Sequence, residues 1–207
     1  DVLWVKKIRT HHSIELDNDG NILTCLEGPV RFDVLPNERF VDQTILKLSS
    51  EGELINQWSV SDILKKEGFQ NYLLSMIGYK PLEGRGKYHL NDVEQCTFNS
   101  SNGIFSKNDL LISFCNISSI IVFDLETEKV KYHFSDKFYR QHDPDFFNDS
   151  IITFYDNYFL DPKGALYTRI FSTNLNNNEY HQVYPRNSEH FFSRTMGKHQ
   201  WLRNGNL

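Results

Sequence analysis

Histidine is the residue type whose placement in this sequence most suggests chemistry. His12, His89 and His142 each stand close to a short strand-like run, and His142 lies in the segment Gln141-His142-Asp143. A neutral imidazole has a lone pair for nucleophilic attack, and its protonated form is an acid, because the ordinary pKa of histidine is roughly 6.5. Since the three residues recur at similar places, we expect them to share one site.

Two other interpretations of these histidines remain open. Each could be a polar residue that is hydrogen-bonded where two strands meet. Three converging imidazoles could instead hold a divalent ion, but the sequence has no HxH or HExxH spacing, so we expect no metal. Residues 17–21, Asp-Asn-Asp-Gly-Asn, resemble the start of a calcium loop but lack the glutamate at its twelfth position, and a hairpin turn is expected there.

Composition and charge exclude several classes of protein. The net charge is −5 and no run of Lys or Arg is longer than a pair, so nucleic acid is not an expected partner. No window approaches the roughly 20 apolar residues of a membrane helix, which predicts a soluble chain. Hydrophobic residues make up 39%, enough for a sizeable core, and the many Phe and Tyr residues favour strands over helices.

The three cysteines, Cys25, Cys96 and Cys115, match neither a disulfide framework nor a CxxC metal site. We expect free, packed thiols, with a Cys25–Cys96 bridge left open. The chain begins without Met, with a strand-like run at 2–5, and ends inside a motif. It is therefore expected to be a piece of a longer protein that extends beyond both ends.

Short strands separated by Gly, Asn and Asp turns repeat along the whole chain. The first unit has strands at 13–16, 22–26, 43–48 and 53–58, with tight turns at 17–21 and after 48. Similar units begin near 89 and 142, and a fourth begins near 199. Units of roughly 50 residues with four strands are typical of β-propeller blades.

The sequence thus predicts an all-β protein, with residues 1–207 forming part of a single β-propeller domain. About three and a half blades are present, so further chain or a partner must supply the rest. A longer interval after the first unit contains apolar residues at helical spacing, beginning at a capping Ser61 and interrupted at Gly68. Residues 61–85 are therefore expected to be a helical and loop insertion between blades.

The repeated motifs resemble those of the arylsulfotransferase-like propellers. The segments that carry the resemblance occur in the family's order: His11-His12-Ser13-Ile14-Glu15-Leu16, His89-Leu90-Asn91-Asp92-Val93, Gln141-His142-Asp143 followed by Phe154-Tyr155-Asp156-Asn157, and Gly197-Lys198-His199-Gln200-Trp201 with Asn204-Gly205-Asn206. The resemblance implies a six-bladed propeller when complete, with histidines around the mouth of a central channel. It also implies an exported protein, periplasmic or extracellular.

The resemblance implies roles for individual residues. His142 matches the histidine that takes a sulfuryl group from an aryl sulfate and passes it to a phenol, with no cofactor. His89 and His12 match its assisting histidines, with His11 as the alternative to His12, and either Asp143 or a neighbouring carbonyl would orient the His142 ring. Apart from the resemblance, Tyr155 and Asn157 lie on the strand after His142 and are candidates for substrate contact, with ordinary sheet packing as the alternative.

Cys115 departs from the family pattern. The segment Ser113-Phe114-Cys115-Asn116 stands where the resemblance calls for an arginine, so Cys115 and Asn116 line the expected substrate site without positive charge. Losing one preorganised donor at a developing anion costs on the order of 10²-fold to 10³-fold in rate. Two hypotheses follow: an arylsulfate sulfotransferase, or a non-catalytic propeller for binding or assembly that has lost the active centre.

Overall fold

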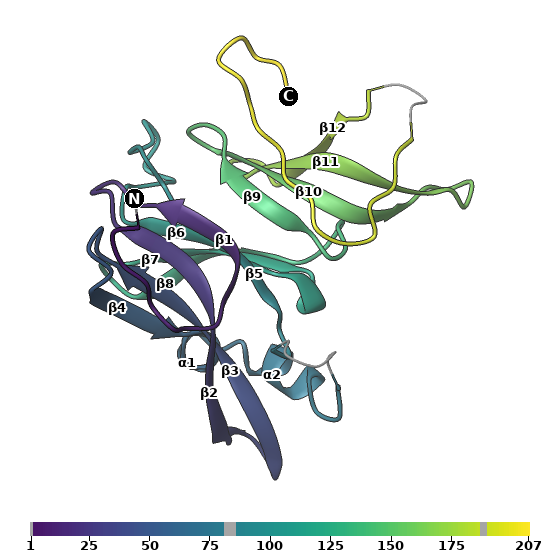
Figure 1. The fold of residues 1–207 in the computed structure, drawn as a ribbon. Coiled ribbons are helices and arrows are strands. Elements are labelled where there is room, and N and C mark those ends of the chain that lie inside the picture. The colour runs from purple at the N-terminus through teal and green to yellow at the C-terminus, as the bar shows by residue number, and fades with distance from the viewer. Residues whose placement is uncertain (1, 81–85, 187–189) are drawn as a thin grey trace.

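Three four-stranded antiparallel sheets make up most of the structure, a computed structural model that describes residues 2–80, 86–186 and 190–207 (Figure 1). The first sheet contains β1 (Thr10–Leu16), β2 (Ile22–Leu35), β3 (Glu38–Leu48) and β4 (Leu54–Ser59). The second contains β5 (Leu90–Gln95), β6 (Asp109–Phe114), β7 (Ser119–Asp124) and β8 (Lys129–Phe134). The third contains β9 (His142–Phe146), β10 (Ile151–Leu160), β11 (Leu166–Asn174) and β12 (Glu179–Tyr184).

The sheets are consecutive blades of a β-propeller, as the sequence repeat predicts. In each sheet the strands pair in sequence order, from β1 to β4, β5 to β8 and β9 to β12. The first strands of the blades are neighbours, because β1 contacts β5 and β5 contacts β9. Side chains from these three inner strands can therefore meet along one line, which is where the candidate histidines lie.

Hydrophobic side chains fill the two spaces between neighbouring blades. One cluster joins the first and second blades around Leu23, Ile45 and Ile112, and the other joins the second and third around Leu111 and Phe154. Because the second blade has a neighbour on each side, every residue of β6 is buried, whereas most of the outer strand β12 is exposed. The inner strands are thereby held by cores on both sides of the second blade.

The Asp17 segment forms a hairpin turn between β1 and β2, as expected. Asp17 Oδ1 accepts hydrogen bonds from the backbone N–H groups of Asp19 and Asn21, both at 2.8 Å. Gly20 has φ +80°, a left-handed conformation that glycine adopts without strain. The Lys47 ammonium forms an ion pair with the Asp17 carboxylate at 2.6 Å, so a lysine lies beside the carboxylate of this turn.

Two short helices, α1 (Val60–Lys66) and α2 (Gln70–Ser75), follow the first blade. The helix cap is Ser59 rather than the expected Ser61, since Ser59 Oγ accepts from the Asp62 N–H at 3.1 Å. Ser61 is buried instead, and its hydroxyl donates to Asp42 at 2.9 Å. Gly68 separates the helices at φ +83°. Residues 81–85 of the expected insertion lie outside the described residues.

Two further expectations concern the N-terminal run and the cysteines. Residues 2–5 do not form the expected strand; Trp4 instead donates from Nε1 to the Ser50 carbonyl at 2.7 Å. Cys25, Cys96 and Cys115 are all buried and unbridged, so the Cys25–Cys96 disulfide is absent. Among the described helices, none combines the length and apolar character needed to cross a membrane.

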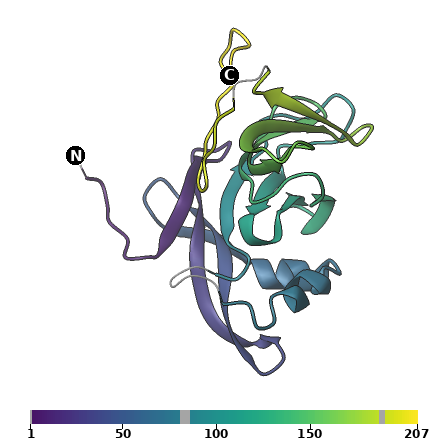
Figure 2. The ribbon, with the colours of Figure 1, turned by 90° about the vertical axis from the view of Figure 1, so that its right-hand side faces the viewer.

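The C-terminal segment, residues 190–207, contains no regular strand but packs on the third blade. Phe191 forms a single bridge with Thr168, and His199 and Trp201 both hydrogen-bond Thr153 on β10. Lys198 reaches in the other direction to Glu15 on β1. The segment thus runs between the first and third blades, as Figure 2 shows from the side.

Candidate active site

Four histidines from the three inner strands converge in the structure. His11 and His12 lie on β1, His89 directly precedes β5, and His142 begins β9. The His12 ring centroid lies 4.6 Å from that of His89 and 6.2 Å from that of His142. The three sequence-predicted candidates therefore come together, although 130 residues separate the first from the last.

His11 belongs to the same group. Its Nδ1 lies 2.8 Å from Nδ1 of His12, and its ring is parallel to that of His89, with the two centroids 6.4 Å apart. In a regular strand, adjacent side chains point to opposite faces. A register shift between His11 and Ile14 breaks this alternation, so both imidazoles can face the same cavity. Both His11 and His12 therefore belong to the site. His12 is the central one, because its ring lies near those of His11, His89 and His142.

The hydrogen bonds of His142 fix its tautomer. Its Nδ1 lies 2.7 Å from Asn157 Oδ1 and 3.1 Å from the Arg140 carbonyl oxygen, and both atoms can only accept. The Asn157 amide cannot be reversed without loss, because its Nδ2 donates to the carbonyls of Ser193 and Met196. Nδ1 of His142 therefore carries the proton, and Nε2 carries the lone pair.

Burial also keeps His142 neutral. Its side chain is buried, and this desolvation lowers its pKa below the ordinary value, outweighing the hydrogen bonds to Asn157 and Arg140 that favour the charged form. The pKa of His11 is lowered by burial as well. The site thus holds a neutral imidazole with its lone pair on a defined nitrogen, which is the requirement for a histidine nucleophile.

Strained backbone surrounds this group. His12, His89, Arg140, Asp143 and Met196 all have φ between +51° and +64°, although none is glycine. Such a conformation costs roughly 1–3 kcal/mol for each residue and persists only where the surroundings enforce it. Five such residues around one set of side chains favour a functional centre over incidental polar contacts.

Two cavities adjoin the histidines, and both are lined by His12, His142 and Met196. The larger has a volume of about 450 Å³ and also contacts His11, Asn91 and Asp92. The smaller has a volume of about 30 Å³, close to that of one water molecule. Its other lining residues are His89, Cys115, Arg140, Arg194 and Thr195.

The remaining sequence-predicted site residues have different places. Cys115 lies in the short 3₁₀ helix Cys115–Ile117 and lines the smaller cavity. Asn116 lines neither cavity: its amide donates to the Lys87 carbonyl and accepts from Arg140 Nη2. Tyr155 packs against Gly197 and Phe191, and Asn157 hydrogen-bonds His142. Neither residue lines the two cavities, so both hold the site residues in position.

Family assignment follows from the sequence as a whole. The model of the arylsulfotransferase (ASST) family matches residues 3–207, which is nearly the entire chain. The chain belongs to the arylsulfotransferase family. Among curated proteins, none is significantly similar to it.

Solved structures similar to this chain are distant in sequence. The WD40 repeats of RRP9 are 14% identical with a TM-score of 0.45, over 93% of this chain and 41% of theirs. A protein of unknown function from Bacteroides caccae is 11% identical with a TM-score of 0.42, over 86% of this chain and 62% of its own. The chain therefore spans less than two thirds of the length of either protein.

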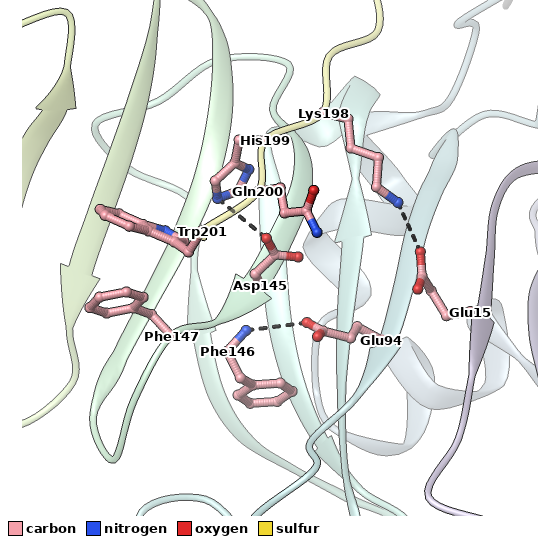
Figure 3. A pocket seen from close by; sticks show the side chains of 9 residues that line it. All are labelled: Glu15, Glu94, Asp145, Phe146, Phe147, Lys198, His199, Gln200 and Trp201. Atoms are coloured by element: carbon pink, nitrogen blue, oxygen red, sulfur yellow. Dashed lines mark hydrogen bonds and ion pairs between the residues drawn. The ribbon is translucent and has the colours of Figure 1, made fainter. Parts of the chain in front are cut away.

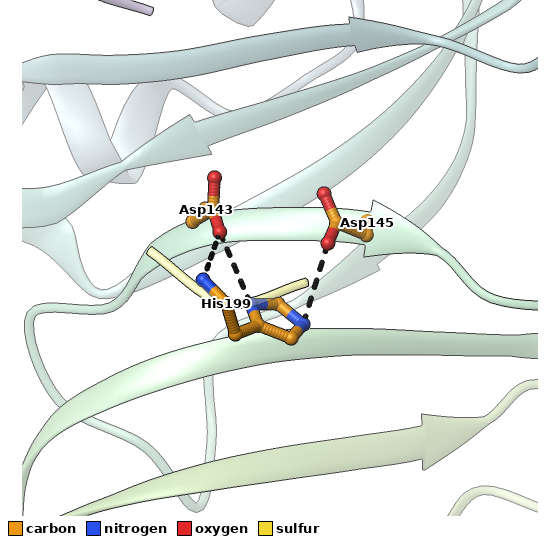
Figure 4. A group of neighbouring side chains, drawn as sticks. All are labelled: Asp143, Asp145 and His199. Atoms are coloured by element: carbon orange, nitrogen blue, oxygen red, sulfur yellow. Dashed lines mark hydrogen bonds and ion pairs between the residues drawn. The ribbon is translucent and has the colours of Figure 1, made fainter. Parts of the chain in front are cut away.

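Acidic side chains hold the C-terminal segment beside the histidines. The backbone N–H of His199 donates to Asp143 Oδ2 at 2.6 Å, and the ring lies between Asp143 and Asp145 (Figure 4). Asp143 is thus engaged with His199, so the Arg140 carbonyl and Asn157, rather than Asp143, orient His142. The donor atoms of Asp143, Asp145 and His199 lie within 4.8 Å of one another, close enough for a metal ion. We assign none, because the imidazole already bridges the two carboxylates.

A third cavity, of about 740 Å³, opens on the other side of this network. Glu15, Glu94 and Asp145 face it from the three inner strands, and Phe147 and Trp201 lie together at one end (Figure 3). Burial raises the pKa of Asp145 to about 7 and also raises that of Glu94. These carboxyls therefore hold protons nearer neutrality than exposed ones do.

Sequence reasoning missed the two arginines at the small cavity. Arg140 directly precedes the Gln141-His142-Asp143 motif, and this position was a signal that could have been used. Arg194 comes from the segment that crosses the third blade, and no local pattern marks it. Asn157 was expected to contact substrate, but its role in setting the His142 tautomer appears only in the hydrogen bonds.

Gly197 should be the glycine least tolerant of a side chain. A Cβ at this position would lie 2.1 Å from Cε1 of Tyr155, whereas at Gly205 nothing lies within 4 Å. We expect Gly197→Ala to lower the free energy of unfolding by about 1–3 kcal/mol through overpacking, measured by urea denaturation. Gly205→Ala is the matched control, since Gly205 also has positive φ. Equal losses in the two variants would refute steric contact with Tyr155 as the cause.

Proposed function

We propose that this chain transfers a sulfuryl group from an aryl sulfate to a phenol through a sulfohistidine at His142. The observation that carries the proposal is the tautomer of His142, whose Nε2 lone pair is maintained by Asn157 and the Arg140 carbonyl. His12 lies beside it, and His89 lies beside His12 and lines the same small cavity, so both can bind the sulfuryl oxygens and move a proton. The family membership supports the same reaction class.

In the first half-reaction, Nε2 of His142 attacks the sulfur of the aryl sulfate. The N–S bond forms as the bond from sulfur to the aryl oxygen breaks, and the departing phenoxide takes a proton from an imidazolium, His12 or His89. His142 keeps its Nδ1 proton, which continues to be held by Asn157 and the Arg140 carbonyl. The product is a sulfohistidine, and the phenol leaves.

In the second half-reaction, an acceptor phenol gives its proton to the imidazole that was deprotonated before. Its oxygen attacks the sulfur, the N–S bond breaks, and neutral His142 is regenerated. Donor and acceptor use the same site in turn, so the kinetics should be ping-pong. The cavity of about 450 Å³ that touches His11, His12 and His142 has room for the aromatic ring.

Intact mass spectrometry tests this proposal directly. The full-length protein is incubated with phenyl sulfate in the absence of an acceptor, and an added SO₃ group, located on His142 by peptide fragmentation, is the expected result. Addition of a phenol should remove the adduct. If no adduct forms and no phenol is released over hours, the chain is not a sulfotransferase.

A non-catalytic propeller is the rival function, and Cys115 is the observation in its favour. The thiol stands where the family resemblance calls for an arginine, in the small cavity beside His142. A binding or assembly module would keep the histidines as packed polar residues and would form no adduct. The same mass measurement therefore separates the two functions.

The pH dependence of adduct formation should reflect the lowered pKa of His142. Above that pKa the imidazole is neutral and attacks; below it, Nε2 is protonated and cannot attack. Because burial lowers the pKa, we expect the rate to stay constant from pH 8 to below roughly 6.5, where an exposed histidine is half protonated, and to fall only at more acidic pH.

A single-turnover measurement with 4-nitrophenyl sulfate isolates this group, because 4-nitrophenolate departs without a proton from the protein. The adduct is measured by mass at each pH. An acidic limb at or above pH 6.5 would contradict the expected shift.

A further inference from the structure

The small cavity beside His142 has the composition of an anion site. Its lining side chains include two arginines, Arg140 and Arg194, and three imidazoles, but no carboxylate. In the described part of the chain, neither arginine forms an ion pair with Asp or Glu, although other arginines such as Arg31 and Arg169 do. Two arginines thus line this cavity with no carboxylate among the lining residues, which favours an anionic ligand.

Arg140 is positioned firmly at this cavity. Its backbone N–H donates to Ser118 Oγ at 3.1 Å, its carbonyl accepts from His142 Nδ1, and its Nη2 donates to Asn116 Oδ1 at 3.3 Å. It is held in the left-handed region at φ +57°. One residue thus sets the tautomer of His142 through its backbone and brings a guanidinium to the same place.

Cys115, in the 3₁₀ helix Cys115–Ile117, lines the same cavity as Arg140. The pKa of Arg140 is raised: burial is the largest single effect and opposes its charge, but the hydrogen bond and charge of Cys115, together with the neighbouring Tyr139 and Tyr158, outweigh it. The guanidinium is therefore charged and lies next to the thiol. The cation that the family pattern places at position 115 is matched in space by one from position 140.

We propose that Arg140 binds the sulfuryl oxygens in this chain and replaces the arginine missing at position 115, with Arg194 as a second cation. A guanidinium presents several N–H donors in a plane, which suits two oxygens of a tetrahedral anion. Negative charge on these oxygens is stabilised throughout the transfer, and loss of such a donor lowers the rate by on the order of 10²-fold to 10³-fold. The catalytic part of this inference rests on the proposed function; the binding of an oxyanion does not.

The test moves the charge from one position to the other in the full-length protein. We expect Arg140→Gln to slow formation of the His142 adduct with phenyl sulfate by on the order of 10²-fold or more, and Arg140→Lys to slow it less. The double variant with Cys115→Arg and Arg140→Gln should form the adduct at least about tenfold faster than Arg140→Gln alone. A purely structural role for Arg140 predicts no such rescue. Arg203→Gln, at an exposed arginine, is the matched control.

Calorimetric titration with inorganic sulfate is the second measurement, and it does not need turnover. Arg140→Gln should weaken sulfate binding at least tenfold, with thermal unfolding used to verify that the variant is folded. If the wild type forms no adduct but Arg140→Gln still weakens sulfate binding, the proposed function fails and the anion site stands. The inference is overturned if folded Arg140→Gln binds sulfate as tightly as the wild type, or if it forms the adduct within threefold of the wild-type rate.

Discussion

Replacing His142 with alanine is expected to abolish the sulfo adduct and to lower phenol release by at least roughly 10⁴-fold, because the variant has no group that can form the N–S bond. The substitution removes the nucleophile that begins β9 but leaves His12, His89 and both arginines in place. The measurement is intact mass after incubation with phenyl sulfate, together with the rate of phenol release.

His181→Ala is the matched control for this variant. The His181 side chain is exposed on β12. The His181→Ala variant should therefore form the adduct at the wild-type rate. Persistence of the adduct in His142→Ala would show that another histidine is the nucleophile. His12 would then be the first candidate, since it lies between His89 and His142.

Replacing Asn157 with leucine is expected to slow adduct formation by on the order of 10²-fold or more, although Asn157 need not touch the substrate. Without Oδ1 as acceptor, the Nδ1–H tautomer of His142 loses its strongest partner, and the proton can move to Nε2, where it blocks attack. Stability should also fall by about 1–3 kcal/mol, because the carbonyls of Ser193 and Met196 lose their donors.

Thr168→Val separates these two effects. The Thr168 hydroxyl donates to the Asn157 carbonyl and accepts from the Ser193 N–H, so it anchors the same segment without contacting His142. We expect it to lower stability comparably but to leave the adduct rate within a few-fold of wild type. Equal loss of rate in both variants would mean that segment anchoring, rather than tautomer control, is the cause.

Arg140 links these predictions to the departure at Cys115. Considered in the sequence alone, a cysteine in place of the expected arginine weakens the case for an enzyme. In the structure, Arg140 and Arg194 line the same cavity as Cys115, so positive charge is present there. The sequence could not reveal this, because residues 115, 140 and 194 lie on separate segments that only blade packing brings together.

Local patterns predicted the parts of the fold that depend on local interactions. The alternating strands, the Asp17 hairpin turn and the helical spacing near 60–75 were readable because turn chemistry and periodicity act over a few residues. Residues 2–5 have the same strand-like character, but among the described residues they pair with no strand, so they remain irregular. The cap of α1 is Ser59 rather than Ser61, because Ser59 Oγ accepts from the Asp62 N–H while Ser61 already lies within the helix.

The sequence by itself determined the β-propeller repeat, the family and the three candidate histidines, since each is encoded in residue type and spacing along the chain. Only the tertiary structure decided that His11 joins them, that Asn157 fixes the tautomer of His142, and that Arg140 stands beside Cys115. These contacts depend on register shifts, left-handed residues and the packing of separate segments, and the resulting positions in space do not follow from the order of residues.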